Sequence, residues 1–185
     1  MPSIILIRHG PVALKASGLL SFEGFRRYCD AYELSGLEPD AEPPRELARL
    51  VRAAKCVFAS DAPRVIDTLA GLGVAADVVD AAFREAPPQA PQLPIQLPMI
   101  VWLALARARG VLDPALTRER EDLRLRSATC AEMLIDATAA GPVMLAGHGW
   151  FNRHVAATLV KNGWRGFAGP GFAKPFGYKI FASVR

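Results

Sequence analysis

The chain has 185 residues, the size of one ordinary domain, with 51% hydrophobic residues, 22% charged residues and a net charge of +4. This balance supplies a buried core and excludes intrinsic disorder as the main state, and no apolar run reaches the roughly 18 residues of a membrane span. Arg8 and His9 come too early for a secretory signal, and the three cysteines lack metal-ligand spacing, so we expect a reduced, cytoplasmic protein without a metal ion.

The first half of the chain alternates short apolar runs with segments of helical periodicity. Prolines introduce two of the helical segments, and Ser21 is placed to cap an earlier one. We expect strands over residues 3–7, 56–59 and 78–79, and helices over 21–33, after Pro43-Pro44 and from Pro63 onward.

The second half begins with a proline-rich stretch over residues 87–98. This stretch cannot form a regular helix or a central strand, because each proline removes a backbone donor. After it we expect helices over 99–108, 117–140 and 149–161, and strands over 143–146 and 178–184. Strands that alternate with helices indicate one α/β domain over residues 1–185, with a mostly parallel central sheet flanked by helices.

Three predicted strands end in polar residues just before a predicted helix. In an open α/β sheet, ligands bind beyond the carboxyl ends of the strands, so we expect these residues to share one crevice. Two histidines and two arginines near helix N-termini suit a tetrahedral dianion, and histidine can attack or protonate near neutral pH. The three segments are Arg8-His9-Gly10, Ser60-Asp61-Ala62-Pro63-Arg64 and Gly147-His148-Gly149.

In these residues the sequence resembles the histidine phosphatase superfamily, which includes the cofactor-dependent phosphoglycerate mutases. The resemblance rests on four blocks that follow the family's order over most of the chain, and it implies a phosphoglycerate mutase-like fold. The blocks are Arg8-His9-Gly10, the set Ser60, Arg64 and Thr68, the acidic block Phe83-Arg84-Glu85, and His148-Gly149.

The resemblance implies a metal-independent phosphomonoester hydrolase that needs no cofactor. His9 would be the nucleophile that forms a phosphohistidine. Arg8 and Arg64 would hold the phosphate oxygens together with Gly149, and His148 would donate to the phosphoryl group.

The resemblance also implies that Glu85 is the general acid that protonates the leaving oxygen. Asp61 is a rival donor, and it is equally well placed to cap the helix that begins at Pro63. Lys15 stands where the family has an asparagine, so it either contacts phosphate or faces solvent. Ser60 either supports the pocket or only caps and packs.

The apolar stretch over residues 95–106 is unusual outside the motifs. A helix that is apolar all round is normally core, and we favour this interpretation over a hydrophobic pocket or an oligomer contact. The segment 87–105 follows the expected acid directly, so we also expect it to border the substrate entrance and to favour apolar phosphate esters over sugar phosphates.

Charge is distributed unevenly along the chain. The first 136 residues hold 16 basic and 18 acidic side chains, whereas the remainder holds six basic and no acidic ones. A positive segment attracts anions, but solvated surface side chains are the simpler interpretation. The six residues form no helical stripe, so nucleic acid is not favoured as a partner; membrane association stays open but is not favoured.

Two alternatives to a phosphatase remain at this stage. One is a phosphoglycerate mutase-like phosphotransferase, and the other is a non-catalytic module that retains the pocket and binds a phosphorylated ligand or a protein. The expected partner is a small-molecule or protein phosphate ester, and the sequence identifies neither the substrate nor the oligomeric state.

Overall fold

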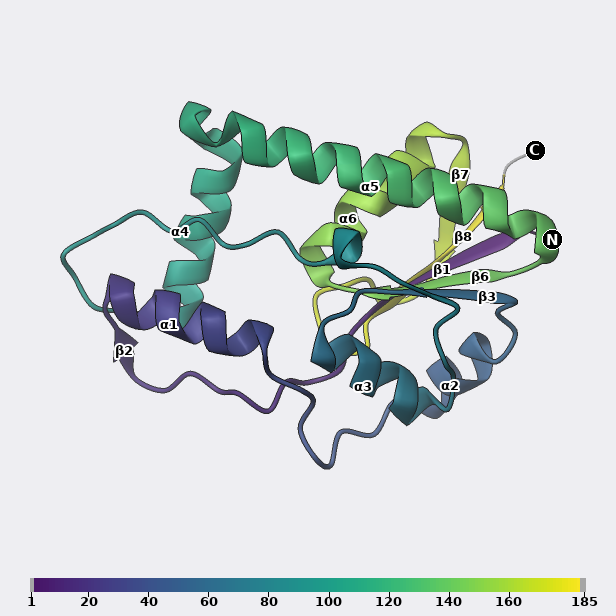
Figure 1. Ribbon diagram of the computed structural model, residues 1–185, viewed down its shortest axis with the longest axis horizontal. Helices are drawn as coiled ribbons and strands as arrows, with labels where there is room; N and C mark the ends of the chain where they lie inside the picture. The colour runs from purple at the N-terminus through teal and green to yellow at the C-terminus, as the bar shows by residue number, and fades with distance from the viewer. Residues whose placement is uncertain (1, 184–185) are drawn as a thin grey trace.

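A six-stranded sheet forms the centre of the computed structural model, which describes residues 2–183 (Figure 1). The strand order is β4-β3-β6-β1-β8-β7. The first four of these strands are parallel, β8 is antiparallel to β1, and β7 is antiparallel to β8. The strands are β1 (Ser3–Arg8), β3 (Cys56–Ala59), β4 (Val78–Val79), β6 (Val143–Gly147), β7 (Trp164–Ala168) and β8 (Tyr178–Ser183).

The two central strands are buried on both faces. Residues 4–7 of β1 are all buried, and so is every residue of β6. Such continuous apolar runs are typical of parallel strands that have helices on both sides. In the register of the two strands, Ile4 pairs with Val143 and Arg8 pairs with Gly147.

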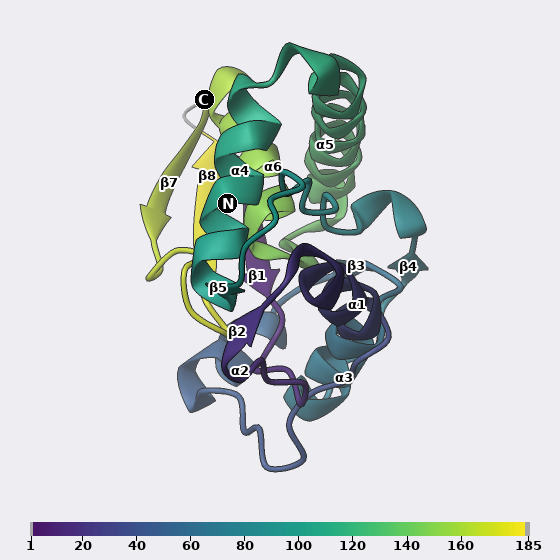
Figure 2. The same ribbon diagram turned by 90° about the vertical axis from the view of Figure 1, so that its left-hand side faces the viewer.

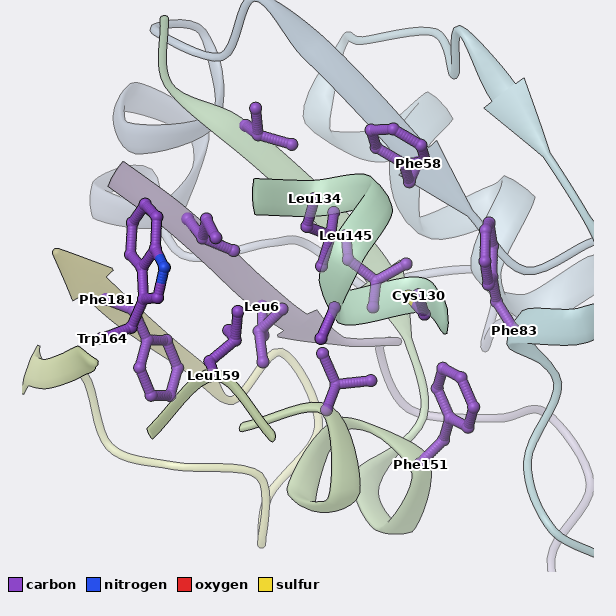
Figure 3. Close-up of a cluster of buried hydrophobic side chains, with 14 of the residues drawn as sticks. Leu6, Phe58, Phe83, Cys130, Leu134, Leu145, Phe151, Leu159, Trp164 and Phe181 are labelled. Carbon is purple, nitrogen blue, oxygen red and sulfur yellow. The ribbon is translucent and has the colours of Figure 1, made fainter. Parts of the chain in front are cut away.

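Helices cover both faces of the sheet (Figure 1). One face is covered by α5 (Thr117–Ala137) and α6 (Gly149–Lys161), and the other by α2 (Arg45–Val51) and α3 (Pro63–Leu72). Each face has its own hydrophobic cluster, because successive side chains of a strand point to opposite sides. Figure 3 shows the cluster beneath α5 and α6, in which Leu6, Leu145, Leu134 and Phe151 come together. On the other face, Ile5 and Ile7 pack against α2 and α3.

The remaining two helices lie beyond the carboxyl ends of the parallel strands. They are α1 (Phe22–Glu33) and α4 (Met99–Leu112), and a two-stranded ribbon of β2 (Leu19–Leu20) and β5 (Leu97–Pro98) joins their beginnings (Figures 1 and 2). A third, small hydrophobic cluster holds them together, in which the rings of Phe25 and Trp102 stack 5.7 Å apart. We call α1, α4 and this ribbon the cap.

The expected elements are confirmed, with differences at their ends. Ser21 caps α1 by accepting a hydrogen bond from the backbone N–H of Gly24. Helix α4 continues to Leu112, and the last turn expected for α5 is a short 3₁₀ segment, Thr138–Ala140. Val184, the expected end of the last strand, lies outside the described residues.

Strand β7 was not expected from the sequence. It contains Gly166, and four of its five residues are exposed, so it lacks the apolar alternation of a half-buried strand. It forms because β8 offers it a hydrogen-bonding edge. Within residues 2–183, every helix is too short or too polar to traverse a lipid bilayer.

Candidate active site

Three neighbouring parallel strands bring the predicted residues to one place. Strands β3, β6 and β1 lie side by side, and each delivers a polar residue just beyond its carboxyl end: Ser60, His148 and His9. Arg64, from the first turn of α3, joins them. His9, His148, Arg64 and Arg8 line a cavity of about 470 Å³ that lies between the sheet and the cap. The predicted crevice therefore exists at the expected edge of the sheet.

The imidazole of His9 is held in one orientation and kept neutral. Its Nδ1 lies 2.8 Å from the carbonyl oxygen of Gly10, so the Nδ1–H donates to that oxygen and Nε2 keeps its lone pair. Burial lowers the pKa of His9 from 6.5 to about 3, and the charges on Arg64 and Arg8 act in the same direction against the hydrogen bond to Gly10. A neutral imidazole with a free Nε2 can act as a nucleophile.

Neighbouring groups come close to the two glycines that follow the histidines. A Cβ atom on Gly10 would lie 2.5 Å from the ring of Phe176, which packs against the turn. A Cβ atom on Gly149 would come within 3.2 Å of the carbonyl oxygen of Phe172 and 3.4 Å of the Arg8 side chain. The His-Gly pairs thus allow the chain to pass close to its neighbours at the site.

The guanidinium of Arg8 is anchored from the opposite wall. Its Nη1 donates to the carbonyl oxygens of Phe172, at 3.1 Å, and Ala173, at 2.6 Å, in the loop before β8. Its Nε is buried and has no hydrogen-bond partner among the described residues. Among the described residues, Arg8 therefore has one buried donor without a partner, on a side chain that lines the cavity.

Arg64 is fully buried and is held by the end of α1. Its Nη1 donates to the carbonyl oxygen of Tyr32, its Nη2 donates to Oε1 of Glu33 at 2.9 Å, and its guanidinium lies 4.8 Å from the centre of the Tyr32 ring. The Nε of Arg64, like that of Arg8, is buried without a partner among the described residues. An anion in the cavity would share this arginine with Glu33.

Both ring nitrogens of His148 form hydrogen bonds. Its Nδ1 lies 3.3 Å from Nη2 of Arg64, which can only donate, so Nδ1 is an acceptor. The Nε2–H then donates to Oγ of Ser60, 3.0 Å away. Burial, followed by the charge of Arg64, lowers the pKa of His148 well below its usual range. To donate to a phosphoryl group through Nδ1, His148 must gain a proton as the anion binds.

The carboxylate of Glu85 lines the cavity and caps helix α6. Its oxygens accept hydrogen bonds from the backbone N–H groups of Trp150 and Phe151, both at 2.9 Å, and from that of Ala86 at 3.0 Å. Nη2 of Arg107 lies 3.8 Å from Oε2. Both carboxylate oxygens of Glu85 are therefore engaged by backbone donors.

Two predicted candidates lie outside the cavity. Lys15 forms a 2.8 Å ion pair with Glu38, and its side chain is 75% exposed, so it faces solvent. Asp61 accepts two hydrogen bonds from Arg84, at 2.6 and 2.7 Å. The alternative role of Asp61 as a helix cap was wrong, because Ala62 holds that position without a side-chain hydrogen bond and the guanidinium of Arg84 takes both carboxylate oxygens.

Apolar and aromatic side chains complete the walls of the cavity. Pro88, Met99 and Leu103 form an apolar wall, which confirms that part of the segment 87–105 borders the cavity. The cavity is also lined by Trp150, whose ring has two guanidiniums near it, that of Arg107 at 4.9 Å and that of Arg153 at 6.0 Å from its centre. Within residues 2–183, no three side chains of His, Cys, Asp or Glu gather into a metal-binding group.

Comparison with known proteins identifies the fold. No family model and no curated protein sequence match this chain. Among solved structures, the product of open reading frame Rv3214 of Mycobacterium tuberculosis matches 96% of this chain and 89% of its own, with 14% identity and a TM-score of 0.54. YhfR of Bacillus stearothermophilus matches 98% and 95%, with 13% identity and a TM-score of 0.54. TTHB049 of Thermus thermophilus matches 96% and 92%, with 19% identity and a TM-score of 0.50. The chain has the phosphoglycerate mutase-like fold, as predicted.

Proposed function

We propose that this protein is a phosphomonoester hydrolase that works through a phosphohistidine on His9. The observation that carries the proposal is a neutral His9 whose Nδ1–H is committed to Gly10, in one cavity with the arginines Arg8 and Arg64. The resemblance of the four sequence blocks to histidine phosphatases supports it. The proposed reaction uses no metal ion, because His9 supplies the nucleophile and the arginines supply the positive charge.

In the first step, Nε2 of His9 attacks the phosphorus atom. The N–P bond forms while the bond from phosphorus to the ester oxygen breaks, and the departing oxygen takes a proton from an acid. Arg8 and Arg64 stabilise the negative charge on the phosphoryl oxygens during the transfer.

We assign the acid to Glu85. A phosphate dianion at the N-terminus of α6 competes with this carboxylate for the N–H groups of Trp150 and Phe151, and this frees an oxygen of Glu85 to carry the proton that the leaving oxygen takes. In the second step, water attacks phosphorus, the N–P bond breaks, and Glu85 takes the proton from that water. Inorganic phosphate leaves and His9 regains its lone pair.

The test is to trap the intermediate with a ³²P-labelled phosphomonoester and to follow release of inorganic phosphate. The wild-type protein should acquire an acid-labile label, and His9→Ala should acquire none while it keeps its fold. His154→Ala is the matched control, because His154 is a histidine on α6 that does not line the cavity. It should label and turn over normally.

The outcomes separate the alternatives. Transfer of the label to a second hydroxyl group instead of water would identify a phosphotransferase. Binding of phosphate without any label on His9 would identify a non-catalytic module. Full turnover by a folded His9→Ala protein would overturn the nucleophile assignment.

A further inference from the structure

A second hollow, of about 640 Å³, adjoins the catalytic cavity and has no part in the proposed reaction. It lies between α6, β8 and the loop that joins β7 to β8, and it shares Arg153, Phe172 and Ala173 with the cavity. Its other basic side chains are Lys161, on the last turn of α6, and Lys179, on β8. We call this hollow, with its three basic residues, the basic groove. A long molecule with one end in the catalytic cavity can continue directly into it.

The positive charge of the basic groove is not neutralised. No acidic residue lines it, and within residues 2–183 none of Arg153, Lys161 and Lys179 forms an ion pair. The chain has no Asp or Glu after Asp136, so α6, β7 and β8 carry basic charges only. Like charges gathered without counterions create a positive potential that attracts an anionic ligand.

The surface between these charges is apolar, with Ala156, Val160 and Pro170 among the lining residues. It offers little for nucleobases to stack on. Phe172 is buried, and the ring of Trp150 already has the guanidiniums of Arg107 and Arg153 near it, at 4.9 and 6.0 Å from its centre. Single-stranded nucleic acids are usually bound on exposed aromatic rings, whereas a peptide needs apolar contacts and charge partners. The lining therefore favours a peptide.

We propose that the basic groove binds the acidic flank of a phosphorylated peptide whose phosphate enters the catalytic cavity. This inference rests on the proposed function and assigns its substrate class. Arg153 and Lys161 are eight residues apart on α6, which is about 12 Å along the helix axis at 1.5 Å per residue. An extended peptide covers that length with about four residues. The acidic residues are therefore expected within about four positions of the phosphorylated one.

The experiment uses two phosphopeptides that differ only in the four positions beside the phosphorylated residue. These four positions are all Asp in one peptide and all Asn in the other. The pair is made once with phosphoserine and once with phosphotyrosine. The wild-type protein should hydrolyse the Asp peptide about five- to tenfold more efficiently, mainly through a lower KM, and 0.5 M salt should remove most of this preference.

The test variant is Lys161→Ala/Lys179→Ala, which should reduce the preference for the Asp peptide to less than about twofold. It should leave hydrolysis of p-nitrophenyl phosphate unchanged, because that ester is too small to reach either lysine. The matched control is Arg52→Ala/Lys55→Ala, which removes the same charge from two exposed residues outside both hollows. It should keep the preference.

Binding is measured separately from turnover with phosphonate versions of the same peptides. Equal Kd values for the Asp and Asn versions would overturn the proposal that the basic groove binds an acidic flank, even if every ester is hydrolysed. Absence of p-nitrophenyl phosphate hydrolysis would contradict the proposed function instead. A 5′-phosphorylated oligothymidylate is tested in the same way. If it is hydrolysed faster than the Asp peptide, with the same dependence on Lys161 and Lys179, the ligand of the basic groove is a nucleic acid and the peptide proposal is wrong.

Discussion

His9 links the chemistry of the cavity to the stability of the fold. Its pKa is about 3 in the folded chain, against 6.5 for an ordinary histidine. Between these values the unfolded chain binds a proton that the folded chain does not, so acidification favours unfolding. The contribution of His9 to stability is complete above pH 6.5 and is lost as the pH falls towards 3. His148 acts in the same direction.

We therefore expect the free energy of unfolding of the wild-type protein to contain a term from His9 that is about 2 kcal/mol smaller at pH 5 than at pH 8. His9→Asn removes the titrating group but can still donate a hydrogen bond in the turn. The free energy of unfolding is measured with urea at both pH values. Its fall from pH 8 to pH 5 should be about 2 kcal/mol smaller in His9→Asn than in the wild-type protein. Parallel pH dependences in the two proteins would show that His9 is not kept neutral by folding.

Glu85 has two roles that different measurements can separate. As the proposed acid, it matters most when the leaving oxygen is strongly basic. Glu85→Gln should slow hydrolysis of an alkyl phosphate by roughly a hundredfold and that of p-nitrophenyl phosphate much less. The comparison is valid where phosphoryl transfer to His9 limits the rate. Equal losses on the two esters would leave Glu85 only its observed contacts with the N-terminus of α6.

At the scale of elements, α4 is both core and cavity wall. Trp102 and Ala106 are buried in the cap, as expected for a core helix, whereas Met99 and Leu103 line the cavity. The opposite surface of the helix is exposed, and Ile100 has 72% of its surface accessible. An almost uniformly apolar sequence cannot reveal this division, because the side that faces the cavity is determined by packing against α1.

This division predicts a change in substrate preference. If the apolar wall contacts the substrate, kcat/KM of the wild-type protein should rise along a series of alkyl phosphates, since each buried methylene contributes about 0.8 kcal/mol. Leu103→Ala should flatten that rise, with little effect on methyl phosphate. Ile100→Ala, on the same helix but exposed, should leave the series unchanged. A flat series in the wild-type protein would leave α4 a structural role only.

The end of α1 holds Arg64 in place through contacts that the sequence block around Arg64 does not contain. The sequence block predicts that Arg64 lies at the site, and strand order explains why it meets His9 and His148 there. The block carries no signal for Tyr32 and Glu33, which hold Arg64 from a helix about thirty residues earlier in the chain. Contacts of this kind arise from tertiary packing, and no local pattern encodes them.

For the whole molecule, the alternation of strands and helices and the mostly parallel sheet could be predicted, because short apolar runs and proline-started helices alternate along the chain. The gathering of Arg8, His9 and His148 around one cavity could be predicted because these residues lie at or directly after strand ends. The gathering of Arg153, Lys161 and Lys179 could not, since Lys179 joins the other two only when β8 lies beside α6. Lys15 and Asp61 were candidates by sequence position, but Glu38 and Arg84 pair with them away from the cavity.

The division of the core predicts that the cap opens separately from the sheet. Two hydrophobic clusters cover the sheet, but the cap depends on a small third one centred on Phe25 and Trp102. Trp102 is fully buried, and its Nε1–H donates to the carbonyl oxygen of Leu20 at 2.7 Å. Elements with few buried contacts unfold locally at lower free energy than the global transition.

We expect backbone amides of α1 and α4 to exchange hydrogen faster than those of β1 and β6 in the wild-type protein. Trp102→Ala should lower the free energy of unfolding of the cap by about 3–5 kcal/mol, because it removes a fully buried side chain. It should therefore accelerate exchange in α1 and α4 by about a hundredfold or more, with little change in β1 and β6. Leu145→Ala, in the sheet core, should accelerate exchange throughout the chain. Uniform acceleration in Trp102→Ala would show that cap and sheet unfold as one unit. Because the cap carries Leu103 and the residues that hold Arg64, selective opening should also lower kcat/KM for alkyl phosphates in a protein that stays folded.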